Sequence, residues 1–294
     1  MTTRSPTPEP TAPNPAAYAG RRIAVGTRHG KQDQLGPAFR EVLGADLVVP
    51  PDLDTDRFGT FSGEIPRTMP AADAARAKAR LAMSITGLPF GLASEASYGP
   101  LPGLGWPGHE EILLFCDDEH GFEILEGHRT TEVPGALRTV AGIDDVPPPL
   151  LAGLPDQALI VRPGGDPGPV EAITKGITDP EALRRAIDRV MADFPDRLAV
   201  VEPDLRAQHN PSRRRVLSGL ARTLARRLAT RCPRCRLPGF GRVDVEPGLP
   251  CRACGTPTAL AGAEIHGCGG CGHRITRPVA AAYADPADCP ACNP

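Results

Sequence analysis

Long apolar runs are missing from this sequence of 294 residues. No stretch approaches the ~18 consecutive apolar residues that span a membrane. The first 20 residues, rich in Pro, Thr and Ala, contain no apolar segment of the kind found in signal peptides. We therefore expect no membrane association, a disordered Pro-rich tail over residues 1–20, and a cytoplasmic protein. Since 40% of the residues are hydrophobic, the rest of the chain can form a core.

Acidic residues are absent from the window between Leu205 and Arg242, which contains eleven arginines. Lysine is scarce throughout, at positions 31, 78 and 175 only, so codon bias explains part of the arginine content. Codon bias does not explain the absence of acids. An Arg-rich helix in this window fits the phosphate backbone of a nucleic acid, and the alternative is a solvated helix face.

The sequence alternates short apolar runs with amphipathic segments. Strands are predicted at residues 22–27 and in the stretches ADLVVPPD, LPFGLASEASYG, EEILLFCDDEHGFEILEGHRTTEV, QALIVRP and RLAVVEPD. Helices are predicted over residues 32–43, 71–86, 179–193 and 210–230. This alternation predicts an α/β fold with a mixed central sheet flanked by helices, which we assign to residues 21–230. Residues 231–294 have too few large apolar side chains for a core, and we expect metal to hold them together.

Eight of the nine cysteines lie after residue 231, in four C-x-x-C pairs. Each such turn presents two thiolates, and two turns complete a tetrahedral site, so eight thiolates suit two structural Zn2+ ions in a double zinc ribbon. A reducing cytoplasm disfavours disulfides. The ligand pairing stays open, with sequential pairing slightly favoured over cross-braced or nested pairing. The ninth, Cys116, is expected in the core. The predicted ligands are Cys232, Cys235, Cys251, Cys254, Cys268, Cys271, Cys289 and Cys292.

The stretch VGTRHGKQDQL, residues 25–35, joins a predicted strand to a predicted helix. A glycine turn with a lysine at a helix N-terminus can receive a phosphate, because free N–H groups and the positive end of the helix dipole meet there. The spacing is not that of a Walker P-loop. By itself the turn also suits an ordinary strand-to-helix connection.

Further stretches in the same order make the chain resemble the inosine-triphosphate pyrophosphatase family, which hydrolyses non-standard purine nucleoside triphosphates to monophosphate and pyrophosphate. The family has A-T-x-N-x-G-K, G-x-T-F-x-E-N-A-x-x-K-A, a strand ending D-D-S-G, and a late S-H-R. The whole chain also looks like an uncharacterised bacterial domain of unknown function. The matching positions are Gly30-Lys31, Gly59 to Glu64, Ala77-Lys78-Ala79, Ser94 to Ser97 and Ser212-Arg213-Arg214.

This resemblance implies Mg2+-dependent attack of water on a nucleotide. Lys31 would hold phosphate, and Glu64 and Glu95 would ligate Mg2+, with Glu95 positioning or deprotonating the water. Alternatively, Glu64 is a loop surface charge, Glu95 a strand-end carboxylate paired with an arginine, Lys78 part of a solvated helix face, and Ser212 only a helix cap. We assign catalysis to Glu95, Glu64 and Lys31. The residues assigned to substrate binding are Arg28, Gly30, Lys78, Arg206, Ser212, Arg213 and Arg214.

A further polar cluster, in VVEPDLRAQHN, stands at a predicted strand end, where open α/β sheets place ligands. An ordinary strand-to-helix connection explains it equally well. The leading interpretation of the whole chain is a Mg2+-dependent nucleoside triphosphate pyrophosphatase with a C-terminal zinc module. The alternative is a non-enzymatic zinc-ribbon protein that binds nucleic acid or a protein partner, with the α/β body as a scaffold or nucleotide sensor.

Overall fold

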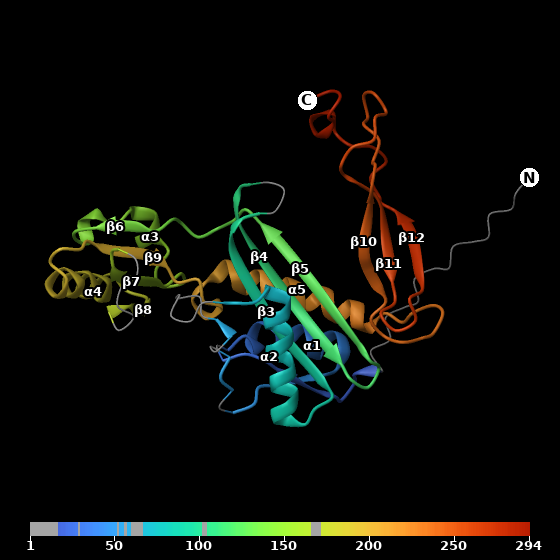
Figure 1. The fold of residues 1–294 in the computed structure, drawn as a ribbon, viewed down its shortest axis with the longest axis horizontal. Helices are drawn as coiled ribbons and strands as arrows, with labels where there is room; N and C mark the ends of the chain where they lie inside the picture. Colours follow the sequence, from blue (N-terminus) through green and yellow to red (C-terminus); the bar gives the residue numbers. More distant parts are fainter. Residues whose placement is uncertain are drawn as a thin grey trace, which may run out of the picture.

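The computed structural model describes residues 17–28, 30–51, 53–55, 58–59, 67–101, 105–165 and 172–294. Each of its three parts has a sheet of its own (Figure 1). We call them the body (described residues between 17 and 131, with 205–230), the inserted lobe (138–203) and the arm (231–294).

The body contains a five-stranded mixed sheet in the order β2-β1-β3-β4-β5. Strand β1 is parallel to both of its neighbours, whereas β3, β4 and β5 are antiparallel. The α/β class predicted from the sequence is therefore confirmed. Its strands are β1 (Arg22–Val25), β2 (Asp46–Val48), β3 (Phe90–Pro100), β4 (Pro107–Asp117) and β5 (Phe122–Thr130), and its helices are α1 (Gln32–Leu43), α2 (Ala71–Thr86) and α5 (Pro211–Ala229).

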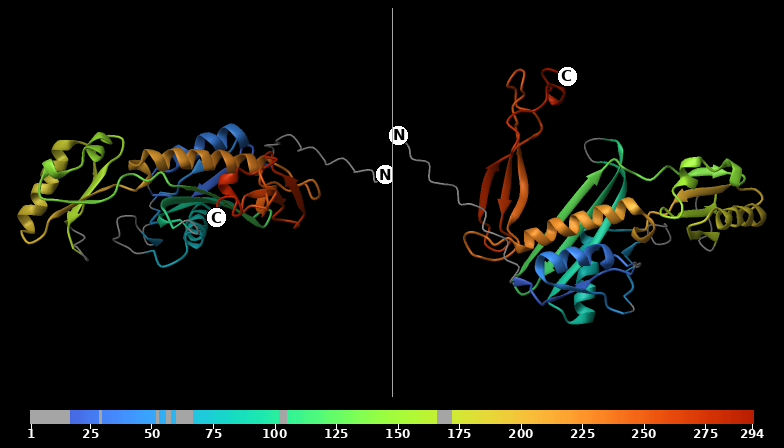
Figure 2. Two further views of the ribbon diagram at one scale, coloured as in Figure 1. Left: turned by 90° about the horizontal axis from the view of Figure 1, so that it is seen from above. Right: turned by 180° about the vertical axis from the view of Figure 1, so that it is seen from behind.

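Helices cover both faces of this sheet. Figure 2 shows α1 and α5 side by side on one face and α2 on the other. Leu35 and Phe39 of α1 and Leu224 of α5 are fully buried in the first core. On the opposite face α2 packs through small side chains, including Ala75 and Ala79, which let its backbone lie close to the strands. The helices thus sandwich the sheet.

The first segment of the body corrects the predicted limit of the tail. Tyr18, placed in the disordered tail by its composition, is buried in the core. Its ring packs edge-on against Phe90 and Phe115, and its hydroxyl donates to the carboxylate of Asp117 at 2.7 Å. An aromatic residue in a Pro- and Ala-rich stretch thus contacts the core, and Ala17 packs beside it. Residues 1–16 lie outside the described part.

The inserted lobe forms a separate antiparallel sheet in the order β6-β9-β7-β8. The sequence predicted β7, β9 and α4 but assigned them to the same body. Helix α4 begins at the predicted N-cap, Asp179, and buries Leu183, Ile187 and Val190 on the lobe's own core. The elements are β6 (Arg138–Val140), α3 (Pro148–Ala152), β7 (Leu159–Pro163), β8 (Thr174–Ile177), α4 (Pro180–Asp193) and β9 (Ala199–Pro203).

The arm is a three-stranded antiparallel sheet in the order β10-β11-β12. Its strands are β10 (Gly241–Pro247), β11 (Ala261–Gly267) and β12 (Arg274–Pro278). One end, the base, adjoins the C-terminal end of α5, and the other end, the tip, projects away from the body (Figure 1). Each of the four C-x-x-C turns, called knuckles below, lies at one of these ends.

Candidate functional site

The carboxyl ends of β1 and β3 mark a switch point in the body's sheet. The chain leaves β1 through α1, which covers one face, and enters β3 from α2, which covers the other. Ligands of open α/β sheets bind outside the strand ends at such points. Gly26 lets the turn after β1 approach α2, since a Cβ there would lie 2.5 Å from the carbonyl oxygen of Lys78. The predicted phosphate turn is therefore at the favoured position for a ligand.

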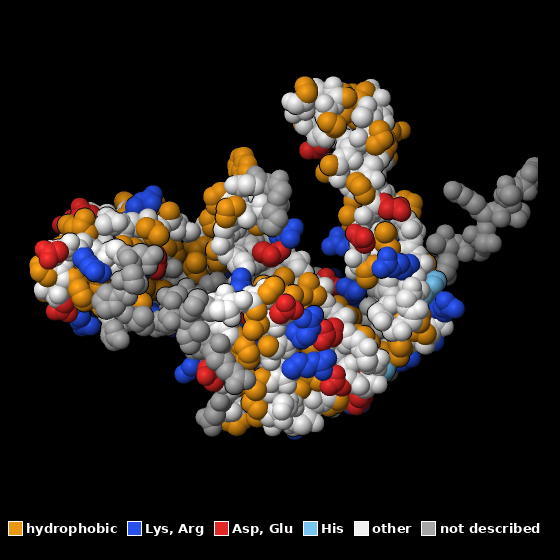
Figure 3. Space-filling view, viewed as in Figure 1, with side chains coloured by type: hydrophobic (Ala, Val, Ile, Leu, Met, Phe, Trp, Pro, Cys, Tyr) orange, Lys and Arg blue, Asp and Glu red, His pale blue; other side chains and the backbone are white. Residues whose placement is uncertain are grey.

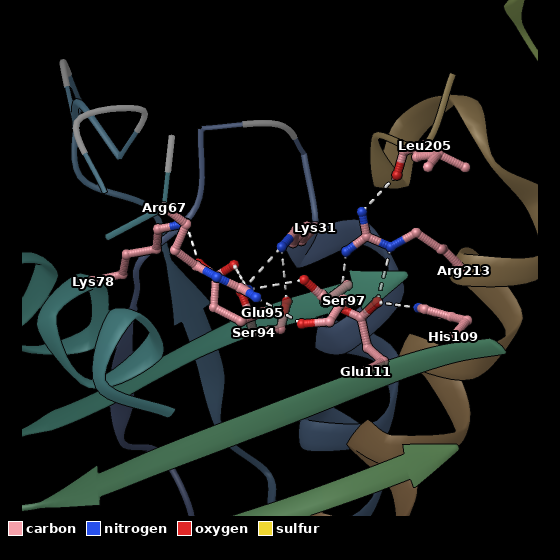
Figure 4. A network of polar contacts seen from close by, with 11 residues as sticks. Lys31, Arg67, Lys78, Ser94, Glu95, Ser97, His109, Glu111, Leu205 and Arg213 are labelled. Atoms are coloured by element: carbon pink, nitrogen blue, oxygen red, sulfur yellow. Dashed lines mark hydrogen bonds and ion pairs between the residues drawn. The ribbon is translucent and has the colours of Figure 1, made fainter. Parts of the chain in front are cut away.

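Two cations meet the backbone of β3 where its partner strand has ended. β1 pairs only with the first residues of β3. Beyond that point the Lys31 ammonium donates to the carbonyl oxygen and hydroxyl of Ser94, at 3.2 and 2.9 Å. Arg67 donates to the carbonyl oxygen of Ala96 at 3.0 Å and the hydroxyl of Ser97 at 2.7 Å (Figure 4). These side chains satisfy backbone acceptors that another strand would otherwise occupy.

On the α2 face, Lys78 of α2 and Arg67 surround a buried carboxylate. Glu95 is 5% exposed and forms an ion pair with Lys78, which is itself 8% exposed. Its second oxygen lies 3.8 Å from a guanidinium nitrogen of Arg67. Glu95 therefore lies between two cations in the middle of β3, not at a strand end as predicted, and Lys78 does not lie on a solvated helix face.

On the α5 face lies a fully buried ion pair. Arg213 donates to both carboxylate oxygens of Glu111, at 2.8 and 3.0 Å, and to the carbonyl oxygen of Leu205 at 2.7 Å. Glu111 also lies 3.1 Å from Nε2 of His109. The two-pronged geometry is the strong form of an arginine–carboxylate contact. Removing either partner would leave a charge buried without compensation.

An aromatic pair continues this network along β3 and β4. The rings of Tyr98 and His109 stack with centroids 4.5 Å apart, and Asn210 donates to the Tyr98 hydroxyl at 3.1 Å. Asn210 also caps α5 by accepting from the backbone N–H of Arg213. The polar network thus ties β3 and β4 to the start of α5.

The ionisable groups around β3 carry an excess of positive charge. Among the described residues, four cations face two carboxylates, an excess of two positive charges in a largely buried place. Such a place favours an anionic ligand. The six residues, called the Lys31 site below, are Lys31, Arg67, Lys78, Glu95, Glu111 and Arg213.

The pKa values follow from this charge distribution. Burial, and then the nearby charge of Arg213, lower the pKa of Lys31 to about 8. For Glu111, burial opposes ionisation, but the charge and hydrogen bond of Arg213, the hydrogen bond of His109 and the charge of Lys31 together outweigh it and lower the pKa to about 2. Glu111 is therefore ionised at neutral pH, and Lys31 holds its proton less tightly than an ordinary lysine.

The structure brings four predicted site residues together, namely Lys31, Lys78, Glu95 and Arg213. Gly30 stands in the turn itself with a φ of 67°, in the left-handed region. Arg28 is exposed, 3.9 Å from Asp54. Glu64 lies outside the described residues.

Three other residues predicted to bind substrate lie at the junction with the inserted lobe. Arg206 is paired with the buried carboxylate of Asp204, and Arg214 donates to a backbone carbonyl at 2.7 Å. Ser212 lines a cavity of about 290 Å³ between the body and the inserted lobe. Helix capping, the alternative for Ser212, is the role of Asn210. The predicted polar cluster at residues 202–210 is thus part of this strand-to-helix junction.

Glu111, His109 and Arg67 were missed in the sequence. Strand alternation offers a signal for the first two, because it places His109, Glu111 and the buried Leu113 on one face of β4. A glutamate on the buried face of a strand requires a partner. No comparable signal identifies Arg67, whose guanidinium lies 3.8 Å from the carboxylate of Glu95 on β3.

The cysteines form two four-thiolate clusters that could each hold one metal ion. In both, the four sulfur atoms lie within 4.8 Å of one another. Sulfur–sulfur distances of 3.6 and 3.8 Å in one cluster and 3.6 and 3.9 Å in the other match the edge of a tetrahedron with metal–sulfur bonds of ~2.3 Å, about 3.8 Å. A disulfide would require about 2 Å. The base cluster is Cys232, Cys235, Cys268 and Cys271; the tip cluster is Cys251, Cys254, Cys289 and Cys292.

This grouping shows that the favoured sequential pairing was wrong, since the first knuckle joins the third and the second joins the fourth. The antiparallel strands explain it. β10 carries the chain from base to tip, β11 returns it, and β12 carries it out again. Consecutive knuckles therefore lie at opposite ends of the arm. Spacing alone did not reveal these strands.

Among the described residues, no group of three or more His, Cys, Asp or Glu side chains apart from these two clusters could hold a metal ion. The two carboxylates of the Lys31 site face cations. The described part of the chain therefore contains no acidic cluster for the predicted Mg2+.

The Arg-rich window is less uniformly exposed than the sequence suggested. Arg213 is buried, Arg222 pairs with Glu41, and Arg227 pairs with Glu126. These acids lie far away in the sequence, on α1, β4 and β5. A window without acids is therefore partly neutralised in three dimensions.

Comparison with known protein families gives one result. Residues 78–294, close to three quarters of the chain, match the domain of unknown function DUF6671. The match includes Lys78, Glu95, Glu111, Arg213 and all eight clustered cysteines. No curated protein and no solved structure matches the chain. Within the described residues, no helix is long and apolar enough to span a membrane.

Proposed function

Since the chain belongs to the DUF6671 family, a domain of unknown function, we infer its activity from the Lys31 site: we propose that the body hydrolyses a nucleoside triphosphate or a related phosphate ligand. The observation that carries this proposal is the excess of two positive charges at the switch point of the sheet. The resemblance of the β1–α1 turn and of β3 to pyrophosphatase motifs supports the same ligand class.

In this proposal, Lys31 and Arg67 bind the phosphate oxygens. Both already donate to carbonyl oxygens and hydroxyls of β3, and a phosphate offers stronger, charged acceptors. Its charge also stabilises the protonated form of Lys31. The buried pair of Glu111 and Arg213 holds β4 and α5 in place behind this contact.

Glu95 is the proposed general base. When a phosphate draws Arg67 away, one oxygen of Glu95 can accept a proton from the attacking water. The water oxygen bonds to phosphorus, and the bond to the departing pyrophosphate breaks. Mg2+ is proposed to arrive with the substrate, because nucleotide phosphates are themselves Mg2+ ligands.

For the arm we propose zinc as the metal in both clusters. Four thiolates at tetrahedral spacing with no open position are typical of a structural zinc site. The eight cysteines then supply the folding energy of the arm and take no part in hydrolysis.

A pyrophosphate-release screen over standard and modified nucleoside triphosphates, with Mg2+ or Mn2+, tests the activity. For the best substrate, Glu95→Gln should lower turnover by ~10²–10⁴. Lys31→Ala should mainly raise KM, by roughly 10- to 100-fold, as expected for the loss of a charged hydrogen bond. Lys175→Ala, in the inserted lobe, is the matched control and should behave like wild type.

Two outcomes contradict the proposal. Turnover by Glu95→Gln at the wild-type rate would remove Glu95 as the base. No turnover by the wild type, together with no binding of pyrophosphate by calorimetry, would remove the site itself and favour a non-enzymatic role.

A further inference from the structure

Five arginines gather at the base of the arm, away from the Lys31 site. Three of them flank or lie within the first knuckle. One stands in the last turn of α5, and one begins β12 beside the third knuckle. The base cluster joins these two knuckles, so the five lie around one metal site. This basal arginine patch consists of Arg226, Arg231, Arg234, Arg236 and Arg274.

These side chains have no acidic partner within the described part of the chain. Four are exposed. The fifth, Arg231, is half-buried, and its Nε is enclosed without a hydrogen-bond acceptor among the described residues. Other arginines of the same sequence window, such as Arg213 and Arg227, are paired with acids of the body. Four members of the patch, Arg226, Arg231, Arg234 and Arg236, belong to this window and have no acidic partner among the described residues.

Neutralisation of the thiolates does not explain the patch. A divalent ion on four thiolates leaves two negative charges at each cluster. Residues 226–242 and 265–278 contain no acid, so five arginines exceed that charge at the base by three. The tip cluster has the same thiolate charge, yet its neighbourhood contains Arg252 together with Asp285 and Asp288. On the face drawn in Figure 3, basic side chains appear at the base and not at the tip.

The chemistry of the patch favours phosphates over bases as its contacts. Guanidinium groups bind phosphate oxygens in a two-pronged manner. The aromatic side chain at the base, Phe240, is 4% exposed and packs against His266 and His273, so it offers no face for stacking on a base. We propose that the basal arginine patch binds the phosphate backbone of a nucleic acid duplex without regard to sequence.

This proposal is independent of hydrolysis in the body and is tested by binding. A labelled DNA duplex is titrated with the zinc-loaded full chain between about 50 and 200 mM salt. Five phosphate contacts predict a slope of log K against log salt of about −4.5, hence a loss of affinity of roughly 10²–10³ over that range. Changing Arg226, Arg234 and Arg274 to Gln should reduce the slope to about −2 and weaken binding by roughly 10²–10³-fold at about 50 mM salt.

Two variants make the test specific. Changing the three exposed arginines of α4, Arg184, Arg185 and Arg189, to Gln removes the same charge from the inserted lobe and should leave the slope unchanged. Changing the three patch arginines to Lys keeps the charge and should preserve the slope. Metal content, measured for each variant, must equal that of the wild type. This control shows that a loss of binding is not caused by unfolding of the arm.

The proposal is overturned if the wild type does not bind the duplex at low salt, or if the α4 variant loses as much affinity as the patch variant. It is also overturned if polyglutamate binds more tightly than the duplex, because the partner would then be an acidic protein.

Discussion

In the body, helices cover both faces of the sheet, whereas the strands of the arm are exposed or half-buried along most of their length. The body's larger core joins four of its strands, β1, β3, β4 and β5, to α1 and α5. The corresponding cluster at the base of the arm has only three buried members among the described residues. They are Cys232, Cys268 and Phe240. Burial of apolar surface therefore stabilises the body, and the arm depends on its metal sites.

Charge is also placed differently in the two parts. In the body the cations of the Lys31 site point inward: three of them meet carboxylates, and Lys31 donates to Ser94. At the base of the arm the arginines point outward and meet none among the described residues. An inward cation needs a partner or a ligand, while an outward one is available to a large polyanion. One residue type thus serves two purposes according to what surrounds it.

Removing the metal should give the largest difference in stability between the arm and the body. A chelator should unfold residues 231–294 and leave the body and its activity in place, since structural zinc contributes ~10–16 kcal/mol in small zinc domains. Metal analysis before treatment should give two ions per chain, and hydrogen exchange afterwards should show loss of protection in β10–β12 alone. Equal loss of protection in α1 or α5 would mean that the arm also supports the body.

Breaking the buried ion pair should act on the body alone. Glu111→Gln leaves Arg213 buried without its counter-charge, and we expect a loss of ~3–5 kcal/mol in the free energy of unfolding by denaturant. Glu41→Gln removes the partner of Arg222, an exposed pair, and should cost less than ~1 kcal/mol. Metal content should stay at the wild-type value in both. A similar loss in the free energy of unfolding of the two variants would contradict the burial of the Glu111–Arg213 pair.

The pH dependence of Lys31 gives the smallest of the three effects. Its pKa of about 8 in the folded body lies below its value in the unfolded chain, ~10.4. The unfolded state therefore binds more protons between these values, and this contribution to stability rises with pH, by up to ~3 kcal/mol. Lys31→Met lacks the contribution, so the stability difference between wild type and variant should change from about pH 8 to pH 10. A constant difference would mean that the pKa of Lys31 is ordinary.

Local elements were the most predictable part of the molecule. The amphipathic pattern of Gln32–Leu43 and Ala71–Thr86 gave both ends of α1 and α2. Each helix ends before a glycine, Gly44 or Gly87, with a φ of 65° or 66°, the left-handed conformation that stops a helix. Here local periodicity and the stop signal agree.

Contacts between distant residues were not predictable in the same way. Glu111 and Arg213 are 102 positions apart, and nothing in either neighbourhood identifies the other. The separation of the inserted lobe also escaped prediction, because strands of one sheet or of two have the same local pattern. Glu95 lies between two cations only because both α2, which carries Lys78, and the segment that carries Arg67 pack against β3. Roles inferred for single residues therefore needed the assembled sheet.

The alternating knuckles have a consequence for a broken chain. A cut between Cys254 and Ala261 would leave one piece with the first two knuckles and the other with the last two. Each metal site takes one knuckle from either piece. Two bound ions would then hold the two fragments together, one at each end of the arm. The fragments would remain associated until the metal was removed. With sequential knuckles, the same cut would release a self-sufficient fragment.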